Sequence, residues 1–128
     1  MSWWRAFVTW VVIILTESLN GVLRQLFLAP LVGDWRARQI GAVIATGITF
    51  AIALALIRWI GARTLGVQLG VGLMWVVLTV AFEYSLGTML GVPTQRMLAD
   101  YDLPNGGLMG IALLIVLVTP ALAAGLRR

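Results

Sequence analysis

The chain has 128 residues, of which 61% are hydrophobic and 11% are charged, and its mean hydropathy is +1.00. A soluble domain has roughly 45–50% apolar residues, so the composition excludes that class and predicts an all-α membrane protein made of one four-helix transmembrane domain over residues 1–128. Cys and His are absent, which excludes thiolate and imidazole catalysis, disulfides, and haem or zinc ligation, so we expect neither an enzyme nor a cofactor.

Four apolar stretches are long enough to cross a bilayer, because a span needs about 20 residues at 1.5 Å per residue. We place the spans at residues 3–28, 39–60, 65–90 and 107–126. The first begins with the basic residue Arg5, as a signal peptide does, but Glu17 and Arg24 interrupt its apolar run. No small-residue cleavage site follows closely, so we expect this span to be retained.

Three connections join the spans. Residues 28–38 are predicted to form a short loop with Pro30 and Gly33 as helix breakers, and residues 60–64 a tight turn through Gly61. Residues 91–107 form the longest connection, in which 94–101 are expected to make one or two helical turns on the membrane surface. Three polar residues of this loop are spaced somewhat as in a calcium loop, but the EF-hand ligand positions are not met, so we expect a capped turn: Asp100, Asp102 and Asn105. In the fourth span, Pro120 should bend the helix.

The arginines predict the orientation of the bundle. One side of the membrane receives five arginines and no acidic residue, and the other receives three arginines together with Asp34, Asp100 and Asp102. The positive-inside rule therefore places both termini in the cytoplasm, and we expect a multi-pass protein of the bacterial inner membrane. The net charge of +4 suits lipid phosphates better than nucleic acid, so the bilayer is the expected partner. The five arginines on the first side are Arg5, Arg58, Arg63, Arg127 and Arg128.

Small and aromatic residues predict how the helices pack. Gly47, Ala51 and Ala55 repeat every fourth residue of the second span, a spacing that lets two helix backbones approach closely. We expect ordinary packing inside the bundle here, with association between subunits as the alternative. Trp75 lies in the middle of the third span, where we expect it to pack between helices rather than bind a ligand.

The ionisable residues inside the spans are the candidate site, because charges are costly in hydrocarbon and must be paired, solvated or used. From Arg5, Glu17 lies roughly 18 Å deep and Arg24 roughly 28 Å deep, and Glu83 lies about 30 Å from Arg63. We therefore expect an Arg24–Glu83 ion pair that ties the first helix to the third.

Glu17 is expected to differ from these two residues, because no basic residue lies at its depth. Polar groups near that level could hydrogen-bond a protonated carboxyl: Asn20, Thr46, Thr49 and Thr79. Glu17 is therefore the candidate proton or cation site, and a structural, permanently protonated carboxyl is the alternative.

Residues 17–41, Phe82 with Glu83, and residues 100–109 resemble a family of small, uncharacterised bacterial inner-membrane proteins with four helices. The resemblance covers the whole chain and implies the fold but no activity. The layout is also loosely similar to the small multidrug resistance transporters, whose first span contains one essential Glu. Of that scheme, Glu17 alone is matched here.

Two classes of function follow from these features. The first is a transporter or channel subunit for ions or small solutes, acting as a homo-oligomer with Glu17, Asn20, Arg24 and Glu83 as binding or proton-exchange residues. The second is a non-catalytic accessory subunit that docks on a larger membrane complex. A membrane enzyme acting on a lipid ranks third, with Glu83 and Asp100 as conceivable acids, because no nucleophile or metal motif is present.

Overall fold

A computed structural model describes residues 3–99, 101, 104 and 107–126, and within these ranges every regular element is a helix. The elements are α1 (Trp3–Leu23), the π-helical η1 (Arg24–Leu28), α2 (Ala29–Val32), α3 (Asp34–Ile60), α4 (Leu65–Met89), α5 (Thr94–Ala99) and α6 (Met109–Leu126). Four stretches are long and apolar enough to cross a membrane: Trp3–Val32, Trp35–Ile60, Leu65–Met89 and Met109–Leu126. The prediction of an all-α membrane protein with four spans is confirmed.

The first connection differs from its prediction, because residues 28–38 do not form a loop. Helical structure continues through η1 and α2 to Val32, and the reversal takes place at Gly33, whose φ of 90° and ψ of 155° suit glycine. Pro30 does not end the helix, because it lies in the first turn of α2, where its missing N–H is not needed. The wider π-helical turn of η1 ends at Leu28, two residues before Pro30.

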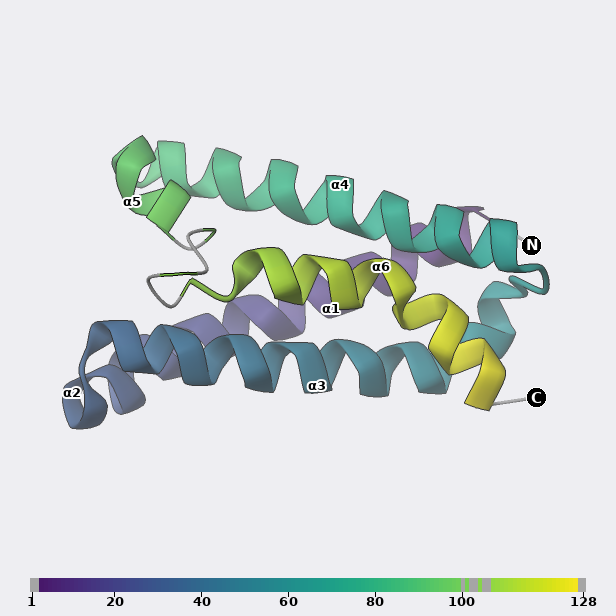
Figure 1. The fold of residues 1–128 in the computed structure, drawn as a ribbon, viewed down its shortest axis with the longest axis horizontal. Helices are drawn as coiled ribbons and strands as arrows, with labels where there is room; N and C mark the ends of the chain where they lie inside the picture. The colour runs from purple at the N-terminus through teal and green to yellow at the C-terminus, as the bar shows by residue number, and fades with distance from the viewer. Residues whose placement is uncertain (1–2, 100, 102–103, 105–106, 127–128) are drawn as a thin grey trace.

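The helices form a bundle in which α6 packs against both α3 and α4 (Figure 1). α1 packs mainly against α3 and makes few contacts with α4. Trp3 and Leu126, the ends of the described chain, lie at one end of the bundle, as four crossings require. Toward the opposite end, which carries α2 and α5, Figure 1 shows α3 and α4 spreading apart.

The buried core lies mostly at the end of the bundle that carries the chain ends. Trp75, with 1% of its surface exposed, packs between helices as predicted, and its indole Nε1 donates to the Ala6 carbonyl oxygen at 3.0 Å. Gln68 is buried as well and donates to the Ala62 carbonyl oxygen at 3.1 Å. The apolar members of this core cluster are Ala6, Trp10, Ile13, Ile14, Ala53, Ile57, Ile60, Ala62, Val71, Trp75 and Ala123.

The expected packing role of the small residues on α3 is wrong. Gly47, Ala51 and Ala55 are all exposed, and no atom would contact a Cβ at Gly47. The close approach between helices occurs instead at Gly72 of α4, where a Cβ would clash with the backbone carbonyl of Leu117 in α6. An i, i+4 spacing of small residues shows that a helix has a narrow face but not which way that face points.

The remaining sequence predictions concern the connection after α4 and the fourth span. A short helix is present as expected, and Met97 of α5 packs on α4 so closely that a Cβ at Gly87 would lie 2.5 Å from its sulfur. The expected turn at Asp100, Asp102 and Asn105 lies outside the described residues. Pro120 is buried within α6, and Figure 1 shows α6 bending toward its C-terminal half.

Candidate functional site

Glu17 lies on α1 just beyond the last core residues of that helix, Ile13 and Ile14. It is partly buried, and its Oε1 accepts a hydrogen bond of 3.1 Å from the Thr49 hydroxyl of α3. The Thr49 side chain is only 4% exposed, so this hydroxyl has little access to water. Of the two α3 threonines predicted at the depth of Glu17, Thr49 is the partner, because Thr46 donates to the Ala42 carbonyl oxygen of its own helix.

Asn20 lies one helical turn after Glu17, and its side-chain amide is close enough to act on the Glu17 carboxyl group. Its Nδ2 also points at the Gly41 carbonyl oxygen of α3, at a long distance of 3.5 Å. Asn20 therefore lies between the carboxyl group of Glu17 and the backbone of α3. Glu17 and Asn20, three residues apart, therefore lie on one face of α1.

Thr79 has a different role from the one predicted, because it does not contact Glu17. Its hydroxyl accepts a hydrogen bond of 3.0 Å from the Trp10 indole Nε1. Together with the Trp75–Ala6 bond, this contact joins α1 to α4 in the first half of α1. Glu17 follows about two turns later, beyond the stretch over which the two helices are tied together.

Glu83 is exposed on α4 and is the other acidic group that interacts electrostatically with Glu17. Of the described side chains that act on Glu17, none carries a positive charge. The site is therefore a carboxyl group supported by one hydroxyl and one amide, with a second carboxylate nearby. We call Glu17, Asn20, Thr49 and Glu83 the polar cluster.

Arg24 lies outside the polar cluster, and no salt bridge joins it to Glu83 among the described residues. Its aliphatic chain packs on α3, where a Cβ at Gly41 would lie 2.9 Å from the Arg24 Cδ. Its Nε is buried without a hydrogen-bond partner. The predicted ion pair is wrong because residue counting gives depth in the membrane but not direction around the helix, and Arg24 begins the π-helical segment that packs on α3.

The polar cluster has the groups needed to exchange a proton or bind a small cation. A threonine hydroxyl can donate to a carboxylate and can also accept from a protonated carboxyl, so the same contact serves both states of Glu17. The negative charge of Glu83 on α4 also favours a proton or a cation at Glu17. Within the described residues, no group of three or more His, Cys, Asp or Glu side chains is placed to bind a metal ion.

Sequence reasoning missed a second concentration of charge, at the end of the bundle that carries the chain ends. There, Arg5, Arg58 and Arg63 line one surface hollow around the turn between α3 and α4. These arginines entered the sequence argument only as counts for the orientation of the spans. Their position at span ends on one side of the membrane was the signal that could have identified the cluster.

Searches among protein families, curated proteins and solved structures find no match to this chain.

Proposed function

We propose that the protein is a transporter or channel subunit for protons or small cations, and that Glu17 is the exchanging group. The observation that carries this proposal is the environment of Glu17: a partly buried carboxyl inside a membrane-crossing helix, hydrogen-bonded to the buried Thr49. An ionisable group at such a position is costly, so one without a described positive partner is a candidate for a functional role.

The carboxyl group of Glu83 on α4 offers a next position for a proton or cation that leaves Glu17 on α1. Glu17 belongs to α1 and Glu83 to α4, two helices that the Trp10–Thr79 and Trp75–Ala6 hydrogen bonds join in the first half of α1, before Glu17. A cation or proton that leaves Glu17 therefore meets a second acidic group on the neighbouring helix. Asn20 contributes an amide that can donate to the carboxylate or accept from the protonated acid.

A homo-oligomer fits this proposal better than a single chain, because four helices with so few polar positions do not enclose a pathway. The exposed stripe of Gly47, Ala51 and Ala55 on α3 offers a narrow helix face that another copy could approach closely. We propose that such oligomers occur in the bacterial inner membrane with both termini in the cytoplasm.

Flux measurements in proteoliposomes test the proposal. A pH gradient is imposed across vesicles that contain a pH-sensitive dye, and sodium, potassium or a quaternary ammonium ion is added outside. The wild type should dissipate the gradient faster than protein-free vesicles, and Glu17→Gln should reduce the rate to that background. The amide keeps the size and hydrogen bonding of Glu17 but cannot exchange the proton.

Asp34→Asn is the matched control, because it neutralises a carboxylate that precedes the second membrane span. This variant should retain wild-type flux. Wild-type protein without flux of any tested ion would contradict the proposal, and so would Glu17→Gln with unchanged flux.

The alternative function is an accessory subunit that docks on a larger membrane complex. The exposed stripe on α3 favours this reading equally, because a foreign helix can use a narrow face as well as another copy can. Purification in a mild detergent followed by mass measurement separates the two. A multiple of the chain mass supports the transporter, whereas a stoichiometric foreign protein that Glu17→Gln releases supports the accessory subunit.

A further inference from the structure

The turn between α3 and α4 lies at the end of the bundle that carries the chain ends, and it borders two hollows. The first hollow has a volume of about 460 Å³, and the second, of about 540 Å³, lies toward Ala124 of α6. Arg58 and Arg63 line both hollows, and Arg5 lines the first. Among the described residues that line the two hollows there are three arginines and no Asp or Glu, so this part of the surface is positively charged.

Arg5 is fixed in place by contacts with the end of α3. Its Nη1 donates to the Trp59 carbonyl oxygen at 3.0 Å, and its guanidinium lies 5.2 Å from the Trp59 ring and 5.5 Å from the Trp4 ring. The carbonyl groups in the last turn of a helix have no partner within the helix, and they give that end a partial negative charge. Arg5 offsets that charge, so the surface of the first hollow keeps its positive character.

The start of α4 adds to this positive surface. Thr64 caps the helix, and its hydroxyl oxygen accepts a hydrogen bond of 3.3 Å from the Val67 N–H. Both residues line the first hollow. The N-terminal end of a long helix carries a partial positive charge and favours anions.

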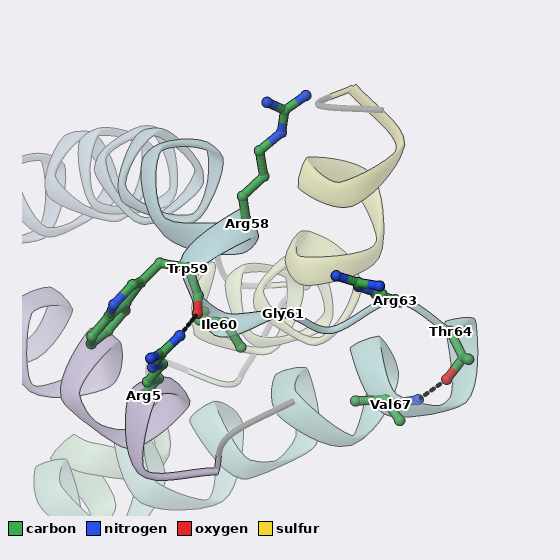
Figure 2. A pocket seen from close by; sticks show the side chains of 8 residues that line it. All are labelled: Arg5, Arg58, Trp59, Ile60, Gly61, Arg63, Thr64 and Val67. Atoms are coloured by element: carbon green, nitrogen blue, oxygen red, sulfur yellow. Dashed lines mark hydrogen bonds between the residues drawn. The ribbon is translucent and has the colours of Figure 1, made fainter.

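Figure 2 shows how the three arginines lie relative to the turn. Arg5 and Arg63 lie on opposite sides of Gly61, and the Arg58 side chain extends away from it. The three guanidinium groups therefore surround the turn rather than meet at one point. Such a spread suits an extended anionic group that lies along the surface better than one small ion held by all three.

The surrounding residues indicate that this anion comes from the bilayer. Trp4 is 60% exposed and Trp59 is 38% exposed, and their rings contact each other edge to face beside Arg5. Exposed Trp rings at the ends of membrane-crossing helices favour the headgroup layer. Guanidinium groups bind phosphate strongly because they donate two parallel hydrogen bonds.

We propose that the turn between α3 and α4 binds the anionic headgroup of a phospholipid, which Arg63 and Arg58 contact at separate points while Arg5 shapes the surface. This site is separate from the polar cluster and independent of the proposed transport function. Inorganic phosphate has the same chemistry and is the other possible source of the anion.

Thermal unfolding in a neutral detergent tests the proposal, because a ligand that binds the folded state raises the midpoint. Phosphatidylglycerol is added to the purified full chain, and phosphatidylcholine and inorganic phosphate are added in parallel. We expect a concentration-dependent rise with phosphatidylglycerol and none with the other two. In the Arg58→Gln/Arg63→Gln variant, the half-saturating concentration should increase about tenfold or more, since each lost charged contact weakens binding substantially.

Arg36→Gln/Arg38→Gln is the matched control, because it removes the same charge from the other end of α3. It should respond to phosphatidylglycerol as the wild type does. If both double variants lose the response equally, or if phosphatidylcholine stabilises the wild type equally, the site does not exist.

Two further comparisons complete the test. A rise with inorganic phosphate alone would overturn the assignment to a lipid while placing a free anion at the turn. Should the double variant fold poorly, Arg63→Gln alone serves, because Arg63 is exposed and its loss leaves the core intact. An unchanged response of Arg63→Gln would contradict its role as a ligand.

Discussion

At the scale of single residues, packing inside the bundle depends on a few close contacts and on hydrogen bonds of buried side chains. Lipid surrounds the outside, so helices gain little from hiding apolar side chains, and backbone approach and polar contacts matter more. Trp10 and Trp75 each bury an aromatic ring and use its N–H to tie α1 to α4. Gly72 allows α4 and α6 to touch backbone to backbone.

We predict that Gly72→Ala destabilises the protein, because the added Cβ would clash with the Leu117 carbonyl and force α4 away from α6. Overpacking of this kind costs about 1–3 kcal/mol and should lower the unfolding midpoint in detergent. Gly66→Ala is the matched control on the same helix, since nothing lies near its added Cβ. Equal midpoints for the two variants would show that α4 and α6 are not in backbone contact.

The candidate site could be predicted only in part, and its residues show why. Glu17 and Thr49 were expected at one depth, and they are hydrogen-bonded, because depth follows directly from the number of residues along a helix. Arg24 and Glu83 were also expected at one depth, yet they do not pair. The direction of a side chain around its helix depends on the π-helical turn at Arg24, which the sequence pattern does not reveal.

At the scale of elements, the four spans could be predicted from apolar length, but the connection between the first two could not. The sequence predicts that both Pro30 and Gly33 end a helix. In the structure the helix continues past Pro30, which follows η1 and lies in the first turn of α2. Gly33 alone reverses the chain, with backbone angles that other residues rarely adopt. A breaker ends a helix only where the local hydrogen bonding cannot adjust around it.

We predict opposite effects for these two residues. Gly33→Ala should lower the unfolding midpoint, because a side chain at a φ of 90° costs of order 1–3 kcal/mol. Pro30→Ala should change it little, because the proline lies in the first turn of α2. A larger loss for Pro30→Ala than for Gly33→Ala would mean that the reversal depends on the proline.

At the scale of the whole molecule, the bundle is packed tightly at one end and spreads at the other. Most core residues lie near the chain ends, whereas the polar cluster lies beyond them, where α1 and α4 are no longer joined. The tight end also carries the arginines of the α3–α4 turn. The molecule therefore has a rigid, positively charged end and a looser half that contains the membrane-embedded carboxyl.

We predict that the tight end faces the cytoplasm, because it carries the arginines of the short connections. Two reporters are used, one that is active only in the cytoplasm and one that is active only after export. Fusion after Arg128 should give activity of the cytoplasmic reporter alone, and insertion between α4 and α6 should give activity of the exported reporter alone. A fusion after Arg128 that reports the outside would reverse the orientation.

We propose that Glu17 exchanges a proton from within the membrane, and labelling with a hydrophobic carbodiimide tests this proposal. This reagent enters bilayers and reacts with protonated carboxyl groups there, and peptide mass measurement locates the adduct. In liposomes we expect the adduct at Glu17 of the wild type and no adduct on that peptide in Glu17→Gln. Absence of modification at Glu17 from mildly acidic to mildly alkaline pH, while other carboxyl groups of the chain react, would contradict the claim.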